Sequence, residues 1–174
     1  AGCIDIEHVD FSLDDVLRNM SDLFSITAGE KGLELFIDIA PDVPDRLRGD
    51  PLRFGQVISN LVNNARIHGF SADEAGSITI AAHRAGDRIE LRVADNGRGM
   101  APDLQTRVFE PFFTTRADAG GTGLGLHIVQ NLVGEVLGGV LRVESTPDVG
   151  TCFIVDLPAD AAETPDVSGP SAPD

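Results

Sequence analysis

The residue types best suited to chemistry lie in two glycine-rich clusters, Asp95–Met100 (Asp-Asn-Gly-Arg-Gly-Met) and Gly120–Leu126 (Gly-Gly-Thr-Gly-Leu-Gly-Leu). Glycine permits backbone torsions and close approaches that a Cβ forbids, so such clusters are typical of a backbone pressed against a flat or anionic ligand. A nucleotide is the first candidate. Between them, residues 109–116 carry three phenylalanines beside a proline and paired threonines, which fits neither a regular helix nor a regular strand and predicts a lid.

The two commonest phosphate-binding loops are excluded by the sequence. The chain has a single lysine, Lys31, and contains no G-x-x-x-x-G-K-S/T motif. No G-x-G-x-x-G opens a helix after a strand either. Because the net charge is −15, an anionic ligand must be held by local positive potential. Free N–H groups at the start of the helix expected after the second glycine cluster would supply it.

A helix expected over residues 51–68 carries polar side chains at four-residue steps, namely Gln56, Asn60, Asn64 and His68. This spacing predicts one polar stripe along the side of the helix. Amides on an otherwise apolar helix are costly unless they are hydrogen-bonded. The residues alone leave two interpretations open: the amides satisfy backbone groups of a neighbouring sheet, or they bind a ligand.

Together these motifs resemble a known family. Asn60–Ala65 (Asn-Leu-Val-Asn-Asn-Ala) is similar to the asparagine box of two-component sensor histidine kinases, and the two glycine clusters resemble the glycine boxes of their catalytic ATP-binding domain. That domain belongs to a superfamily shared with DNA gyrase, mismatch-repair ATPases and heat-shock chaperone ATPases. The resemblance covers about residues 11–158 and implies the Bergerat fold with a mobile ATP lid.

The resemblance also implies the ligands and the roles of individual residues. ATP is the expected substrate, ADP the product and Mg²⁺ the metal, with Asn64 coordinating the metal and Asn60 assisting with metal and phosphates. Asp95 would accept the exocyclic amine of adenine, and Arg116 would reach a phosphate and act in catalysis with the two asparagines. The other implied nucleotide contacts are Gly97, Gly99, Phe113, Thr115, Gly121, Thr122, Gly123, Leu124, Gly125, Leu126 and Thr151.

Asp95 and His68 are both candidate nucleotide contacts, and each also has a simpler structural interpretation. Asp95 begins an Asp-Asn-Gly run, which is also typical of an Asx turn. His68 precedes Gly69 at the expected helix end, where it would either contact a phosphate or satisfy the helix dipole. Many relatives carry Lys or Arg where this chain has Ile67, so one phosphate contact is missing or rerouted.

The residue at position 60 separates transfer from hydrolysis. Hydrolysing branches of the superfamily carry a glutamate there, whereas Asn60 cannot act as a general base. The γ-phosphate is therefore expected to pass to a histidine of another domain. Two alternatives remain: a nucleotide-gated pseudokinase without phosphotransfer, suggested by Ile67, and a serine kinase resembling anti-sigma factors, which the complete phenylalanine lid disfavours.

The acceptor histidine is expected outside this chain. Its four histidines, His8, His68, His83 and His127, do not lie in the H-D/E-x-x-x-P context of a phosphoacceptor helix. The expected partners are the histidine-bearing dimerisation domain of the parent kinase and, indirectly, a response regulator receiver domain. The acidic charge excludes nucleic acid and an anionic membrane surface as partners. We expect a monomeric fragment of a homodimeric parent.

The location of the chain is inferred from its cysteines and apolar runs. Cys3 and Cys152 stand far apart, and the sequence shows no signal peptide and no apolar run of membrane-spanning length. This usage favours a reducing cytosol. The chain is expected to be the cytosolic portion of a sensor that can be membrane-anchored.

The order of the expected helices and strands, which must position these motifs, predicts an α+β two-layer sandwich with a mixed, largely antiparallel sheet and helices on one face. Three domain regions are expected: residues 1–10 as the end of an upstream dimerisation and phosphoacceptor region, 11–158 as the catalytic ATP-binding domain, and 159–174 as a disordered linker or tail. Helices are expected over 12–28, 51–68, 102–108 and 124–137, and strands over 33–39, 77–83, 88–94, 140–145 and 151–157.

Overall fold

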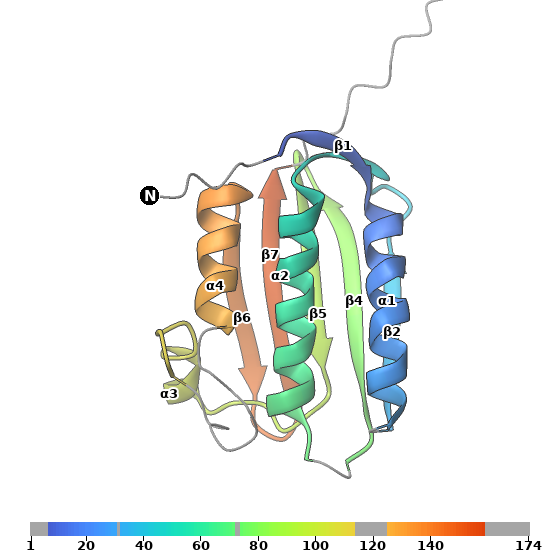
Figure 1. The fold of residues 1–174 in the computed structure, drawn as a ribbon. Coiled ribbons are helices and arrows are strands. Elements are labelled where there is room, and N and C mark those ends of the chain that lie inside the picture. The colour runs from blue at the N-terminus through green and yellow to red at the C-terminus, as the bar shows by residue number, and fades with distance from the viewer. Residues whose placement is uncertain (1–6, 31, 72–73, 114–124, 159–174) are drawn as a thin grey trace, which may run out of the picture.

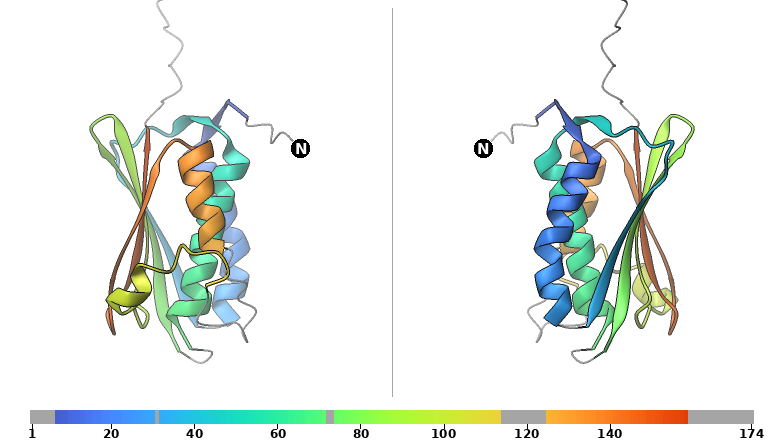
Figure 2. Two further views of the ribbon diagram at one scale, coloured as in Figure 1. Left: turned by 90° about the vertical axis from the view of Figure 1, so that its left-hand side faces the viewer. Right: turned by 90° about the vertical axis from the view of Figure 1, so that its right-hand side faces the viewer.

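The computed structural model describes residues 7–30, 32–71, 74–113 and 125–158. They form two layers, a five-stranded sheet and a layer of helices on one of its faces (Figures 1 and 2). The expected α+β two-layer sandwich is therefore confirmed. Among the described residues, no helix combines the length and the apolar character needed to cross a membrane.

The sheet has the strand order β2-β4-β5-β7-β6. β2 pairs with β4 in parallel, and the remaining neighbours are antiparallel, which makes the sheet mixed and largely antiparallel as expected. Its strands are β2 (Leu33–Ile39), β4 (Gly76–Ala85), β5 (Arg88–Asp95), β6 (Val140–Thr146) and β7 (Gly150–Pro158).

Alternating burial shows which face of the sheet the helices cover. In β4, Ile78, Ile80 and Ala82 are buried while the residues between them are partly exposed. Successive side chains on a strand point to opposite faces, so one face meets the helices and the other faces solvent. The same two-residue period in the sequence predicted these strands correctly.

Helix α1 (Leu13–Glu30) begins where its capping residues predict. The hydroxyl oxygen of Ser12 accepts a hydrogen bond from the backbone N–H of Asp15 at 3.2 Å. A side-chain acceptor at this position satisfies one of the free N–H groups of the first turn. Leu13, Leu17 and Met20 then bury the side of α1 that faces the sheet.

Helix α2 (Pro51–Asn64) lies at the centre of the helical layer (Figure 1). The carboxylate of Asp50 accepts the N–H of Arg53 at 3.1 Å, and Pro51 occupies the first turn, as the sequence predicted. Four of its apolar side chains are fully buried, namely Val57, Ile58, Leu61 and Val62. The expected helix to about residue 68 is present, but its last turn is the π-helical segment η1 (Ala65–Gly69).

Two further helical regions follow, the first near β6 at the edge of the sheet and the second in the helical layer beside α2 (Figures 1 and 2). The helix expected over 102–108 is shorter, because α3 spans only Pro102–Gln105 and is followed by turns. Helix α4 (Gly125–Asn131) continues into the π-helical segment η3 (Leu132–Val136), which together match the helix expected over 124–137. Val129 and Val133 are fully buried and tie this region to the core.

One pair of strands was not predicted. β1 (Val9–Ser12) pairs antiparallel with β3 (Arg46–Gly49) and forms a separate two-stranded sheet. Ordered structure therefore includes Val9 and Asp10, which lie before the expected domain boundary at residue 11. Four-residue strands whose pairing partners lie far apart in sequence carry too little periodicity to be recognised.

Candidate functional site

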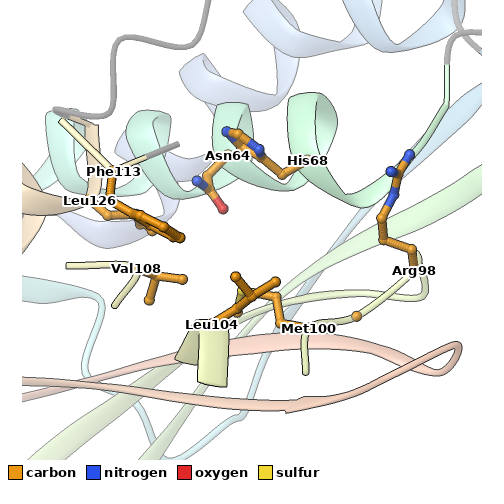
Figure 3. Close-up of a pocket in the computed structure, with 9 residues that line it drawn as sticks. Asn64, His68, Arg98, Met100, Leu104, Val108, Phe113 and Leu126 are labelled. Carbon is orange, nitrogen blue, oxygen red and sulfur yellow. The ribbon is translucent and has the colours of Figure 1, made fainter. Parts of the chain in front are cut away.

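A cavity of about 240 Å³ lies between the end of α2 and the loop after β5. Asn64 and His68 line it from the helical side, with Met100 and Leu104 opposite (Figure 3). Phe113 and Leu126 lie at one end and Arg98 at the other (Figure 3). The complete lining is Asn64, His68, Arg98, Gly99, Met100, Leu104, Val108, Phe113 and Leu126.

Five predicted site residues, far apart in sequence, meet in this cavity. They are Asn64, His68, Gly99, Phe113 and Leu126. They come from α2, η1, the loop after β5, the segment after α3, and α4. Concave sites with mostly apolar walls and a few convergent polar groups are the usual form of small-molecule pockets. The arrangement favours a ligand whose apolar ring contacts the walls while polar groups meet the amide and imidazole.

The polar stripe predicted for α2 does not form one continuous surface. Gln56 lines a second groove, between α1 and α2, where its amide oxygen accepts a hydrogen bond from Arg53 at 3.3 Å. Asn64 lies in the cavity, and half-buried Asn60 lies one turn earlier, outside the lining. Each four-residue step on an α-helix turns about 40° past a full circle, so residues at this spacing drift around the helix. The prediction that all four side chains share one stripe was therefore wrong.

The segment η1 places His68 beside Asn64. A π-helical turn carries more residues per turn than an α-helix, which shifts the side chains that follow it around the axis. Both Asn64 and His68 line the cavity (Figure 3). Such turns occur often at functional sites. The sequence predicted the position of this helix end but carried no signal for its π-helical form.

Asp95 ends β5 beside this cavity. Its Oδ1 accepts the backbone N–H of Gly97 at 2.9 Å, so the Asx-type turn is present. Burial raises the pKa of the Asp95 carboxyl above its ordinary value, and the backbone amides of Gly97 and Thr151 oppose that shift. A half-buried carboxylate with room for more hydrogen bonds is suited to accept a donor from a ligand.

Two glycines allow η1 and the loop after β5 to touch. The backbone N–H of Arg98 donates to the carbonyl oxygen of Gly69 at 2.8 Å, and a Cβ at Gly97 would collide with that same carbonyl group. A Cβ at Gly69 would come within 3.1 Å of Oδ1 of Asp95. Gly99 adopts φ +66°, a conformation that favours glycine. These close approaches fix Asp95 relative to the end of α2.

Thr151 lies next to Asp95, because the two residues are paired in register on β7 and β5. Its hydroxyl oxygen is 2.8 Å from that of Ser145 on the neighbouring strand β6. Thr151 is buried. The predicted contacts Asp95 and Thr151 are therefore adjacent, although both lie beside the cavity lining rather than within it.

The phenylalanines at the start of the expected lid lie in different surroundings. Phe109 packs edge-on against Phe153 at a centroid distance of 6.4 Å. Phe113 lines the cavity, and the guanidinium carbon of Arg107 is 4.5 Å from its ring centroid. Phe112 is 74% exposed and has φ +64°. The segment is thus anchored at Phe109 and contributes Phe113 to the site.

Several predicted contacts lie outside the described residues. They are Thr115, Arg116, Gly121, Thr122, Gly123 and Leu124. Gly125 begins α4 and is exposed, and a Cβ added to it would meet no atom of the described residues within 4 Å. Within the described ranges, no group of three or more His, Cys, Asp or Glu side chains is placed to hold a metal ion.

Sequence reasoning missed four residues of the lining. Met100, Leu104 and Val108 recur at four-residue spacing, which would have indicated one apolar side of a short helical segment facing the site. Arg98 also lines the cavity, and its guanidinium donates to the hydroxyl of Ser71 at 3.1 Å. No local signal distinguishes Arg98 from a solvated surface arginine.

Comparison with known proteins defines the class. The chain belongs to the family described as histidine kinase-, DNA gyrase B-, and HSP90-like ATPase, whose model matches residues 49–161. Fold, motifs and family agree, and the resemblance inferred from the sequence is confirmed.

Within that family, the similar proteins are sensor histidine kinases. The chain is 37% identical to the signal transduction histidine-protein kinase BarA of Escherichia coli (strain K12), over 98% of this chain and 19% of BarA. It is 39% identical to the sensor histidine kinase ZraS of Salmonella typhi, over 87% of this chain and 31% of ZraS. The chain thus spans less than a third of the length of either relative.

Solved structures place it with the catalytic portion of such kinases. The nucleotide-free catalytic domain of histidine kinase ThkA superposes with a TM-score of 0.75 at 29% identity, covering 88% of this chain and 96% of that domain. Full-length ShkA in complex with AMPPNP gives a TM-score of 0.82 at 31% identity, over 95% of this chain and 34% of ShkA. The chain is a histidine kinase-type ATPase catalytic domain of the sensor kinases.

Proposed function

We propose that this chain binds Mg–ATP and transfers the γ-phosphate to a histidine on a separate dimerisation domain of its parent kinase. One observation carries the proposal: the end of α2, with Asn64 and His68, faces the Gly99–Met100 loop across an apolar cavity, with Asp95 held beside it. The structural relative ShkA is described in complex with AMPPNP, an ATP analogue, which supports a nucleotide in this family.

The residues present fit an adenine nucleotide. Apolar Met100, Leu104 and Phe113 line the cavity and would contact the base and sugar. The Asp95 carboxylate would accept a hydrogen bond from the exocyclic amine of adenine, and Gly97 and Gly99 would leave space for the adenine ring. Arg116, Thr115 and the backbone N–H groups of residues 121–125, most of which lie outside the described residues, are proposed from the family resemblance to hold the phosphates.

The donor set also fits a magnesium ion bound together with phosphates. The side-chain amide of Asn64 lines the cavity. Neutral amide oxygens suit a hard cation that takes its other ligands from phosphate and water. When bound, the ion would neutralise charge on the phosphates. Asn64 would hold it directly, and Asn60, one turn earlier, would support it.

Phosphotransfer rather than hydrolysis follows from the chemistry at position 60. An amide cannot take a proton from water, so Asn60 leaves the γ-phosphate for a better nucleophile. The role of this chain is then to position the phosphate for an incoming imidazole. We place this reaction in the cytosol, with a response regulator as the eventual phosphate acceptor.

The decisive experiment mixes the purified chain with ATP, Mg²⁺ and the histidine-bearing dimerisation domain of the parent protein. We expect Mg²⁺-dependent ATP binding by calorimetry, and an acid-labile, base-stable phosphate on the second domain. Asn64→Ala should abolish the transfer. Absence of ATP binding by the folded wild-type chain would refute the proposal.

A second function, nucleotide-gated signalling without transfer, is favoured by one residue. Half-buried Ile67 lies in η1 between the cavity-lining residues Asn64 and His68, at a position where the family resemblance implies Lys or Arg in many relatives. The same mixture separates the two functions, because a pseudokinase would bind ATP and leave the histidine domain unlabelled.

A further inference from the structure

A small hydrogen-bond network on β6 and β7 surrounds the hydroxyl group of Ser145. Its Oγ accepts the backbone N–H of Met100 at 2.8 Å, lies 3.0 Å from the carbonyl oxygen of Gly150, and lies 2.8 Å from the hydroxyl oxygen of Thr151. Ser145, Thr151 and Asp95 follow one another in register across β6, β7 and β5. The network therefore lies directly beside the residue expected to contact the base.

Counting donors fixes the direction of every bond in this network. A serine hydroxyl has one proton and two lone pairs. The carbonyl of Gly150 can only accept, so Ser145 must donate its proton there. The N–H of Met100 can only donate and takes one lone pair. The remaining lone pair can only accept, so the hydroxyl of Thr151 donates to Ser145.

This direction decides what Thr151 can offer to a ligand. Since its single proton points at Ser145, its free lone pairs can only accept hydrogen bonds. The neighbouring carboxylate of Asp95 also accepts only, with Oδ1 already bound to the N–H of Gly97. Two acceptors side by side match a ligand group that carries N–H donors and repel one that carries a carbonyl oxygen.

A second contact holds Ser145 in this orientation. The side-chain amide of Gln105 donates to the carbonyl oxygens of both Met100 and Ser145, at 3.1 and 2.9 Å. This amide connects the end of α3 to the same two residues, one of which lines the cavity. A hydroxyl with all its hydrogen-bonding capacity used has little freedom to reorient.

We propose that Ser145 is a positioning residue that orients the hydroxyl proton of Thr151, and so makes the site select a 6-amino purine over a 6-oxo purine. This inference rests on the proposed function, because it requires the base to approach Asp95. Ser145 itself does not touch the ligand. Without its hydroxyl, the proton of Thr151 is free to turn toward the base and to pair with a 6-oxo group.

The test measures the dissociation constants of ATP and inosine triphosphate, which differ at this position of the base. Wild-type chain should prefer ATP, and Ser145→Ala should lower the ratio of the two affinities by about fivefold, the value of one neutral hydrogen bond. Ser145→Thr, which keeps a hydroxyl, should restore the ratio. Thr79→Ala removes a hydroxyl from the solvent face of the same sheet and should leave the ratio unchanged.

A double-mutant cycle then assigns the effect to Thr151. In a Thr151→Val background no proton remains to be oriented, so Ser145→Ala should no longer change the ratio. Where the alanine variant loses its fold, Ser145→Cys keeps the side-chain shape with a much weaker acceptor and should also lower the ratio.

The outcomes are distinguishable. Equal weakening of both nucleotides in Ser145→Ala, with an unchanged ratio, would overturn the inference and leave Ser145 a structural residue. Failure of the folded wild-type chain to bind either nucleotide would overturn the proposed function, and this inference with it.

Discussion

Replacing Asp95 with asparagine should weaken nucleotide binding without unfolding the domain, because it changes only one side-chain oxygen. The substitution keeps the size of the side chain and exchanges one carboxylate oxygen for an N–H₂ donor. Because Oδ1 is held by the N–H of Gly97 at 2.9 Å, the amide oxygen should stay there and turn the new donor toward the ligand. A ligand amine would then face a donor instead of a charged acceptor.

The expected loss of affinity follows from that one hydrogen bond. A hydrogen bond to a charged group contributes about 1.5–3 kcal/mol. The dissociation constant for ATP should therefore rise by about 10- to 150-fold, measured by calorimetry. Asp87→Asn, in the exposed turn between β4 and β5, is the matched control for the lost charge and should bind as wild type. Unchanged affinity in Asp95→Asn would refute the assignment of this carboxylate to the base.

Asp95→Asn should be at least as stable as wild type at pH 7, although it binds ATP more weakly. Burial raises the pKa of Asp95 above its ordinary value of 3.8, so the charged form is disfavoured in the folded state. That penalty is absent below pH 3.8 and develops as pH rises through the folded-state pKa. Asparagine carries no such penalty, so its thermal midpoint at pH 7 should equal or exceed that of wild type. The gain should shrink as pH falls through the folded-state pKa, and a midpoint well below wild type at pH 7 would contradict this reasoning.

Three further predictions concern the metal, the loop contact and the cysteine. Asn64→Ala should remove the Mg²⁺-dependent part of ATP affinity, about tenfold or more, while affinity without Mg²⁺ stays unchanged; equal losses with and without the ion would exclude a metal ligand. Gly97→Ala should lower the free energy of unfolding by about 1–3 kcal/mol in urea titration, because its Cβ would collide with the carbonyl of Gly69. An unchanged urea midpoint would show that the backbone moves aside at no cost in stability. Burial raises the pKa of the Cys152 thiol above 9.0, so alkylation at pH 8 should be slower than that of an exposed cysteine, as mass spectrometry of the modified peptide would show; reaction at the ordinary rate would argue against burial.

Local signals in the sequence were sufficient for most of the fold. The Asp50–Pro51 pair and Ser12 predicted where two helices begin, and two-residue alternation together with turn signals predicted the five strands of the main sheet. These signals act within a few residues, through caps, turns and periodic burial, and survive in a single sequence. The π-helical turn η1 and the small β1–β3 sheet were missed, because neither has a distinctive local pattern.

The candidate site was predictable by residue type but not by arrangement. Motif resemblance selected Asn64, Gly99, Phe113 and Leu126, the four-residue spacing added His68, and the structure brings these five to one cavity. The predicted polar stripe failed at Gln56, which lies in the groove beside α1, because helical geometry rotates it away from Asn64.

By itself, the sequence determined the family, the order of the helices and of the five strands of the main sheet, and the residue types at the site. Only the tertiary structure decided that Gly69 lies against Gly97 and Asp95, and that Ser145 lies between Met100, Gly150 and Thr151. The contacts of Gly69 with Gly97 and Asp95, and that of Ser145 with Met100, join residues tens of positions apart along the chain, whereas Gly150 and Thr151 reach Ser145 across the β6–β7 hairpin. The long-range contacts form only when α2 packs on the sheet and the strands align in one register, and no local pattern encodes that packing.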